Sequence, residues 1–302
     1  MIFQIKPKLS FGVERTKGIV ALVILAVIYA GTGVVTRYLS LHFTILQQIY
    51  WRILIAFILG LVIFPRQFHF GKILKITSRE WLLLTARSTA NFLFAAPLWI
   101  AVANIAKLAN VGFIDSLPIT AFFSLVLHLE KGSLEKTILI FLSFIGILIL
   151  SVKDLTSISS FGFGEFLILL SGFFFAYRNF SRIWHTKLLN DLEITKVMFF
   201  LGFIVVFATS LILGEKLIIP NWSVELIFML ILGGVIMIAN IFLTNYGFAR
   251  VSPVLGSIII NLEAVLAMFF GFIFYGEVLT LRELLGGLLI VTTVFGMSKL
   301  KQ

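Results

Sequence analysis

Long uninterrupted apolar stretches, separated by short polar segments, dominate this sequence of 302 residues. A membrane-spanning helix needs about 20 mostly apolar residues, and continuous runs of this length indicate helices rather than the alternating strands of a barrel. We therefore predict an all-α integral membrane protein with about ten transmembrane helices. The expected spans are residues 18–39, 46–64, 80–102, 110–129, 134–152, 162–184, 194–213, 224–249, 252–275 and 281–298.

The composition agrees with a lipid environment. Hydrophobic residues make up 60% of the chain and charged residues only 13%, and the mean hydropathy is +1.10. A soluble domain has about one quarter charged residues. The apolar run that begins near Gly18 is too long for the hydrophobic region of a cleavable signal peptide, so we expect it to be retained as the first span. Membrane lipid is therefore an expected partner.

The charge distribution indicates an orientation. The formal net charge is +10, which in a soluble protein would suggest a nucleic-acid partner. Here the basic residues lie in short loops between apolar runs, so we expect no nucleic acid to bind. With the N-terminus in the cytoplasm, Lys and Arg are about three times as frequent in the inner segments as in the outer ones. We expect both termini to be cytoplasmic, and the short loops favour a bacterial cytoplasmic (inner) membrane.

Several kinds of chemistry have no signature in the sequence. The chain has no cysteine, and its four histidines are scattered without metal-ligand spacing. It also has no phosphate-binding loop of the Walker type, so ATP-driven transport by this chain alone is not expected. We predict no metal, no cofactor and no catalytic residue.

The two halves of the chain repeat each other weakly. A shift of 146 residues places Tyr29-Ala30 on Phe175-Ala176, within the first span of each half. After one further residue of slip, Ser133 and Thr280 align as expected N-caps of the fifth spans. Thr280 and Glu283 have the spacing of a capping box.

The number of spans determines how the two repeats are related. Because five spans per half is an odd number, the second half must enter the membrane from the opposite side. We therefore predict two inverted five-helix repeats, residues 1–152 and 153–302. Inverted repeats are typical of transporters, with the solute site near the midplane where the halves meet.

Short motifs support a resemblance to a known family. They are Tyr29-Ala30-Gly31, Trp51-Arg52, Arg87, Leu117-Pro118 with Glu130, and Asn261-Leu262-Glu263-Ala264 through Gly276-Glu277. In these motifs the sequence resembles the drug/metabolite transporter (DMT) superfamily, and specifically its ten-helix EamA-type members. Two departures are Ala264, where the family usually has proline, and Leu129, where it usually has glycine.

The resemblance implies a transporter and not an enzyme. Members of that family move amino acids, nucleotide-related metabolites and vitamins, so the expected partner is a small-molecule solute. The resemblance leaves the substrate, the direction of transport and a homo-oligomeric state open.

Two acidic residues within predicted spans are candidate functional groups. A charge at a helix centre costs at least ~2.5–3.5 kcal/mol, so it should face a cavity or a partner. Glu263 lies near the middle of the ninth span, and Asp115 precedes Pro118 in the fourth and aligns with Asn261. Each is either a coupling site for protons or solute, or a structural partner of an intramembrane arginine. The small residues on the same helix face as Glu263 are also consistent with close packing between helices.

Three arginines also fall within predicted spans. Arg87, with Asn91 one turn further on, is expected to face a cavity and hold a carboxylate or phosphate of the solute. The alternative is an ion pair with Asp115 or Glu263. For Arg52 and Arg178 we favour side chains that extend to the level of the lipid headgroups.

Other polar and aromatic residues can line a passage through the membrane. They are Asn240, Thr244, Tyr29 and Trp99, and the alternative for each is helix–helix packing. The leading hypothesis is a secondary transporter with alternating access, coupled to protons or working by facilitated exchange. The alternatives are an intramembrane enzyme acting on lipid, which requires clustered reactive groups, and a non-transporting scaffold, which requires that the charges be sealed in pairs.

Overall fold

The computed structural model describes residues 12–65, 69–105, 117–151, 163–186, 188–216, 222–275 and 278–300. Within these ranges the regular structure is entirely helical, as predicted. Six helical segments are long and apolar enough to cross a membrane. They are α1 (Val13–Ser40), α2 (Ile45–Ile63), α10 (Asp191–Ile212), α11 (Val224–Phe248), the segment Pro253–Phe270 and α14 (Leu281–Lys299).

The other helices are shorter or interrupted. The region predicted as the third span consists of three consecutive helices, of which the middle one is a π-helix. The segment Pro253–Phe270 is likewise divided, at Asn261. These elements are α3 (Phe70–Ile73), α4 (Ser78–Thr89), the π-helix η2 (Ala90–Ala95), α5 (Ala96–Ile105), α7 (Ile119–Val126), α8 (Leu134–Ser151), α9 (Phe163–Phe180), the 3₁₀ helix η4 (Ser181–Trp184), α12 (Pro253–Ile260) and α13 (Leu262–Tyr275).

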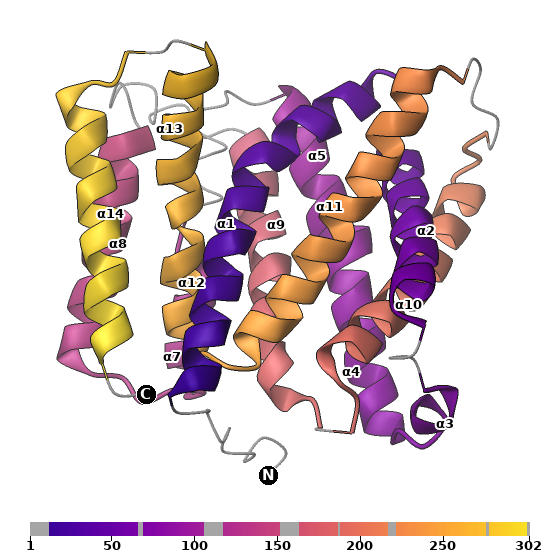
Figure 1. Cartoon of the computed structure of the whole chain (residues 1–302), viewed down its shortest axis with the longest axis horizontal. Coiled ribbons are helices and arrows are strands. Elements are labelled where there is room, and N and C mark those ends of the chain that lie inside the picture. The colour runs from indigo at the N-terminus through magenta and orange to yellow at the C-terminus, as the bar shows by residue number, and fades with distance from the viewer. Residues whose placement is uncertain are drawn as a thin grey trace.

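The long helices stand side by side and cross the molecule from one edge to the other (Figure 1). α1 begins at the lower edge in this view, and α14 ends there. The Nη2 of Arg15 joins these two ends, because it donates to the carbonyl oxygens of Ser298 at 2.7 Å and Leu300 at 3.2 Å. Both ends of the described chain therefore lie at the same face of the molecule.

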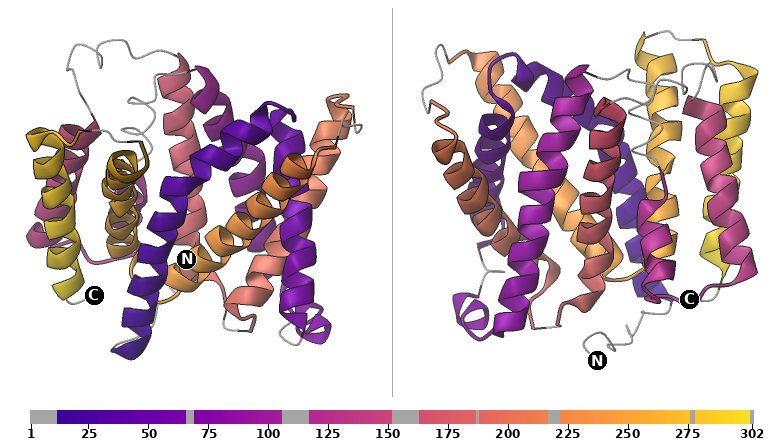
Figure 2. Two further views of the ribbon diagram at one scale, coloured as in Figure 1. Left: turned by 45° about the horizontal axis from the view of Figure 1, so that its top comes forward. Right: turned by 180° about the vertical axis from the view of Figure 1, so that it is seen from behind.

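Helix contacts repeat between the two halves of the chain. Figure 2 shows one of these contacts in its left view, where α1 (indigo) crosses α11 (orange). α1 packs on α11, and the corresponding helix of the second half, α9, packs on η2 and α5. α2 packs on α11, just as α10 packs on α4. The pairs α2–α10, α7–α12 and α8–α14 join equivalent helices. Each of these contacts therefore has a counterpart when the two halves are exchanged.

The predicted capping box is present at the start of α14. The Oγ1 of Thr280 accepts from the backbone N–H of Glu283 at 3.2 Å, and the Oε2 of Glu283 accepts from the N–H of Thr280 at 2.8 Å. The α14 helix then lies very close to α8. A Cβ built on Gly286 would lie 2.8 Å from the carbonyl oxygen of Gly146, so only glycine permits this approach.

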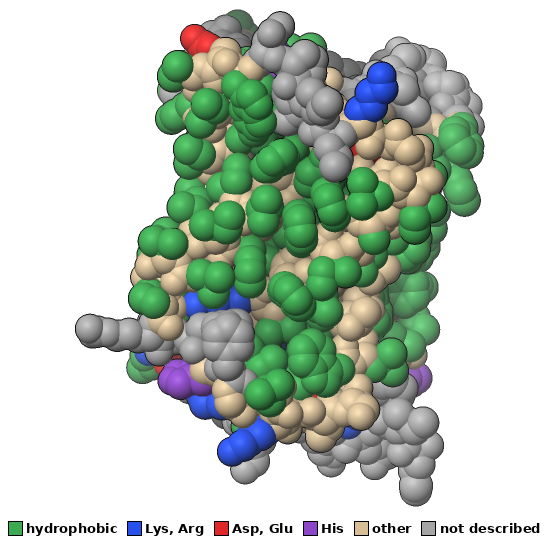
Figure 3. All heavy atoms as spheres, turned by 90° about the vertical axis from the view of Figure 1, so that its right-hand side faces the viewer, with side chains coloured by type: hydrophobic (Ala, Val, Ile, Leu, Met, Phe, Trp, Pro, Cys, Tyr) green, Lys and Arg blue, Asp and Glu red, His purple; other side chains and the backbone are tan. Residues whose placement is uncertain are grey.

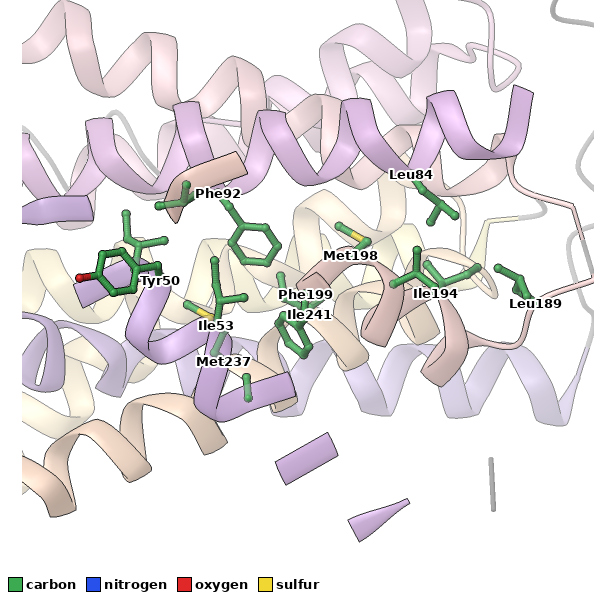
Figure 4. Close-up of a cluster of buried hydrophobic side chains, with 14 of the residues drawn as sticks. Tyr50, Ile53, Leu84, Phe92, Leu189, Ile194, Met198, Phe199, Met237 and Ile241 are labelled. Carbon is green, nitrogen blue, oxygen red and sulfur yellow. The ribbon is translucent and has the colours of Figure 1, made fainter. Parts of the chain in front are cut away.

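Apolar side chains fill the interior and cover the outside. The largest buried cluster packs between α2, η2, α10 and α11, and includes Ile53, Phe92, Phe199 and Met237 (Figure 4). Large apolar side chains also cover most of the described part of the face seen in Figure 3. A surface of this kind is stable in lipid and not in water.

Candidate functional site: a polar cavity between the helices

A cavity lies among helices of both halves. The space open to the centres of water molecules in it measures about 160 Å³, which is enough for on the order of ten waters. Residues of α1, α2, η2, α5, α7, α9, α11, α12 and α13 line it. The lining mixes apolar and aromatic side chains with a smaller set of polar ones, which is typical of a small-molecule site.

The predicted site residues fall into three groups. Tyr29, Asn91, Trp99, Asn240 and Glu263 line the cavity. Two more are fully buried outside the lining, namely Arg87 and Thr244, and the Oγ1 of the latter has no hydrogen-bond partner within the described ranges. The remaining candidate, Asp115, lies outside the residues that the structure describes.

Arg178 is the centre of the polar network in the cavity. It lies in the last turn of α9 and is 3% exposed. Its Nη1 donates to the Oδ1 of Asn91 at 2.8 Å, its Nη2 to the hydroxyl of Tyr29 at 2.9 Å, and its Nε to the Oδ1 of Asn179 at 3.1 Å. The Tyr29 hydroxyl in turn donates to the Oδ1 of Asn240 at 3.2 Å. All of these partners are neutral.

The π-helix η2 helps to position this network. Asn91 lies in its first turn, and α9 packs against it. A single π-helical turn inside an α-helix rotates the side chains that follow and is frequent at functional sites. Ser171 of α9 also donates its hydroxyl to the carbonyl oxygen of Ala95 at 2.8 Å, which satisfies a backbone group of the irregular turn.

Arg52 of α2 is the second arginine of the cavity lining, and it is 5% exposed. Its Nη1 donates to the Oγ1 of Thr36 at 3.4 Å, and its Nε has no partner within the described chain. The side chain lies on Gly233 of α11, where a Cβ would come within 3.1 Å of the Arg52 Nε. The guanidinium is therefore held by packing more than by hydrogen bonds.

The structure contradicts the expectation that Arg52 and Arg178 extend to the lipid headgroups. Both side chains are buried and line the cavity. The reason lies in the tertiary structure. Polar side chains of neighbouring helices provide a polar environment inside the protein, and the sequence of one span does not reveal it. One signal in the sequence pointed to Arg178. Phe175 aligns with Tyr29, and Arg178 lies three residues after Phe175, on the same helix face as Phe175.

Arg87 lies directly behind Arg178. Its Nε and Nη2 donate to the carbonyl oxygen of Arg178 at 3.2 and 2.9 Å, and its Nη2 also donates to the Oδ1 of Asn245 at 2.8 Å. These contacts fix the end of α9 against α4 and α11. In this structure Arg87 therefore supports the cavity wall from outside.

Glu263 enters the lining at the break between α12 and α13. Asn261 ends α12, and Glu263 lies in the first turn of α13. The Nδ2 of Asn261 donates to the Oγ of Ser143 at 3.0 Å, which ties the break to α8. Irregular backbone at membrane depth is tolerated where it is buried in protein or lines a cavity.

A second polar region, the ion-pair layer, lies at the end of the bundle where α1 begins. Its members are Glu14, Glu80, Arg182, His185, Asp191 and Arg250. Asp191 accepts from the Nη2 of Arg182 at 2.5 Å and from the Nη1 of Arg250 at 2.7 Å, and Arg250 also donates its Nε to Glu14 at 3.0 Å. These bonds connect η4, α10, the end of α11 and the start of α1.

The same layer contains a buried histidine. The Nδ1 of His185 lies 2.6 Å from the Oε1 of Glu80, and burial lowers the pKa of His185 to about 4. The Nε2 of His185 has no partner in the described part of the chain, which suits a neutral ring that donates only through Nδ1. A protonated ring would leave a buried N–H donor unsatisfied.

The described residues contain no group of three or more side chains arranged to hold a metal ion. The prediction that the protein has no metal and no cofactor remains a prediction.

The model of the EamA-like transporter family matches the chain twice, over residues 16–152 and 162–299. A solved structure titled only "Crystal structure of protein" is similar with a TM-score of 0.75 and 11% sequence identity, covering 93% of this chain and 97% of the other. At this identity the similarity concerns the fold alone. None of the curated proteins matches the chain.

Proposed function

The chain belongs to the EamA-like transporter family, and from this membership we propose that it is a secondary transporter that carries a small metabolite through its cavity by alternating access. The observation that carries the proposal is the cavity itself, which is lined by polar side chains of both halves. The family consists of transporters, which favours transport over lipid chemistry. The scaffold alternative requires in-span charges sealed in pairs, and the buried arginines of the cavity have neutral partners instead.

We further propose ten membrane helices in two inverted repeats, residues 1–152 and 153–302. The repeated helix contacts support this arrangement, because an exchange of the halves preserves them. Two irregular elements, the π-helix η2 and the break at Asn261, adjoin the cavity. Such discontinuous helices are typical of the binding sites of secondary transporters. The proposed location is a bacterial cytoplasmic membrane, with both termini cytoplasmic.

Opening of the molecule at the ion-pair layer would require several contacts to separate. The bonds Glu14–Arg250 and Glu80–His185 each join the first half to the second half. In an alternating-access cycle these contacts close one entrance and break when that entrance opens. The layer therefore supports a two-state bundle rather than a permanent pore.

Glu263 is the proposed coupling residue, because it is the acidic side chain among the described residues of the cavity lining. A carboxyl group in such a site can exchange a proton as the cavity changes its access. Asp115 is the second candidate from the sequence. Facilitated exchange without protons is the alternative mode of transport.

The test is a counterflow assay in proteoliposomes with amino acids, nucleosides, nucleotides and vitamins as solutes. We expect one class to accumulate, and we expect Glu263→Gln or Asp115→Asn to abolish its transport or remove the pH dependence. Glu225→Gln is the matched control, because that side chain is exposed at the start of α11. Transport that is normal and equally pH-dependent in both variants would refute the coupling assignment. Absence of counterflow for every class in folded protein would count against the transporter itself.

A further inference from the structure

The two arginines of the cavity lining have no carboxylate partner in the described chain. Arg178 donates to two amide oxygens and a phenol, and Arg52 makes one long hydrogen bond to the hydroxyl of Thr36. Neutral partners orient a guanidinium but leave its charge uncompensated. An uncompensated charge at membrane depth is costly, so it persists where a function requires it.

The charge balance of the lining is positive. Among the described lining residues, Arg52 and Arg178 are basic and Glu263 is acidic. A third buried arginine, Arg87, lies behind the wall and donates to neutral oxygens. The described part of the lining therefore favours an anion over a cation of the same size.

The two cavity arginines differ in how many donors they have left. The Nε, Nη1 and Nη2 of Arg178 all donate to protein oxygens. Within the described residues Arg52 makes a single hydrogen bond, of 3.4 Å to Thr36, although a guanidinium carries five N–H donors. Arg52 therefore has N–H groups left to donate to a ligand oxygen, whereas Arg178 contributes mainly its charge.

The geometry along α1 separates the two charges. Arg178 bonds to Tyr29 and Arg52 to Thr36, and these α1 residues are seven positions apart, or roughly 10 Å along a helix. Aromatic side chains, including Trp99 and Phe175, line the same cavity. A ligand that reaches Arg52 can therefore also place an apolar part against these rings.

Resting on the proposed transport function, we propose that the solute is an organic anion. Its carboxylate or phosphate binds the guanidinium of Arg52, within the positive field of Arg178, and its apolar or aromatic part packs on the rings of the cavity. Guanidinium groups suit both anions, because their planar N–H donors match two oxygens at once.

The test compares probes that share a ring and differ in charge. Benzoate and phenyl phosphate are the anions, benzamide is neutral, and benzylamine is cationic. We expect the two anions to raise the unfolding temperature of the purified full-length protein in detergent, at constant ionic strength. We expect benzamide and benzylamine to leave it unchanged. Equal stabilisation by the neutral or the cationic probe would overturn the proposal.

A substitution of Arg52, a substitution of the glycine on which Arg52 packs, and one control locate the site. Arg52→Gln should abolish the shift caused by the anions, and Arg37→Gln, which removes an exposed charge from the same helical bundle, should retain it. Gly233→Ala keeps every charge but places a methyl group within 3.1 Å of the Arg52 Nε, and it should weaken anion binding at least threefold. If folded Arg52→Gln and Gly233→Ala proteins both bind anions as the wild type does, the assignment to Arg52 is wrong.

A flux assay separates this inference from the function on which it rests. Counterflow of phenyl phosphate that Arg52→Gln eliminates would support both. Anion binding without flux of any solute would leave the anion site standing and refute the transporter. Flux confined to cationic solutes would support the transport function and refute the proposal that the solute is an anion.

Discussion

Arg178 and Arg182 lie one helical turn apart, yet they belong to two regions that differ in how the charge of an arginine is balanced. Arg178 faces the cavity and donates to the neutral side chains of Asn91, Tyr29 and Asn179. Arg182 faces the ion-pair layer, where its Nη2 lies 2.5 Å from a carboxylate oxygen of Asp191. Among the described residues, the same residue type therefore has a carboxylate partner in one region and only neutral partners in the other.

The difference separates charges that stabilise the protein from charges that are kept for a ligand. In the ion-pair layer, loss of one partner leaves another charge buried without compensation, which is strongly destabilising. In the cavity, loss of an arginine removes a charge that no carboxylate of the described residues neutralises. The two regions should therefore respond in opposite ways to the same kind of substitution, and the unfolding temperature measures this response.

The largest effect is expected for Asp191→Asn. This change keeps the size of the side chain but leaves Arg182 and Arg250 without their shared carboxylate. Breaking a buried pair costs about 3–5 kcal/mol, so the unfolding temperature in detergent should fall by several degrees. A fall no greater than that of an exposed charge substitution would show that the layer contributes little to stability.

A smaller effect is expected for His185, and it depends on pH. The pKa of His185 is about 4 in the folded protein because of burial, against an ordinary value of 6.5. The unfolded chain therefore binds a proton first as the pH falls, and the contribution to stability is present above pH 6.5 and is lost down to about pH 4. Wild type should lose on the order of 1–3 kcal/mol relative to His185→Gln over this range.

The measurement is a series of thermal unfolding curves for both proteins between pH 7 and pH 4. Parallel curves for the two proteins would mean that His185 does not titrate in this window. A loss confined to the variant would contradict the neutral, buried state of the ring.

For Arg52→Gln, little change in stability is expected, together with a large change in function. Its guanidinium makes one 3.4 Å hydrogen bond and has no carboxylate partner in the described residues, so its removal should leave the unfolding temperature unchanged or raise it. Counterflow of the solute should fall at least tenfold, about 1.4 kcal/mol. A fall in stability comparable to that of Asp191→Asn would erase the distinction between the two regions.

The smallest effect is expected for Lys17→Gln. Lys17 pairs with Glu14 at 2.7 Å, but both side chains are about half exposed. Ion pairs in contact with water contribute little to stability. The unfolding temperature should stay within the error of the measurement, and this variant therefore serves as the baseline for the other three.

Much of the fold follows from the sequence because lipid imposes simple requirements. A backbone in hydrocarbon must satisfy its own hydrogen bonds, so long apolar runs become helices. The all-helical structure and the family resemblance are confirmed, and so is the capping box of Thr280 and Glu283. The π-helix at residues 90–95 was not predicted, because its sequence is as apolar as that of an ordinary helix.

The candidate site was predicted less completely. Tyr29, Asn91, Trp99, Asn240 and Glu263 line the cavity, and their polar or aromatic character within apolar spans was the signal. Two lining arginines, Arg52 and Arg178, were expected at the lipid headgroups instead, because a lone arginine in a span is compatible with that position. Whether a long, flexible side chain extends to the headgroups or finds polar partners inside the protein depends on helices that are distant in the sequence.

The sequence by itself determined that this chain is a helical membrane protein with a repeated design, since apolar length, capping residues and motifs are local properties. Only the tertiary structure decided what each buried charge does. Arg178 lies against amide and phenol groups, whereas Arg182 lies against Asp191, although the two residues are four positions apart. The physical reason is that the energy of a buried charge depends on the groups around it, and these come from helices that only folding brings together.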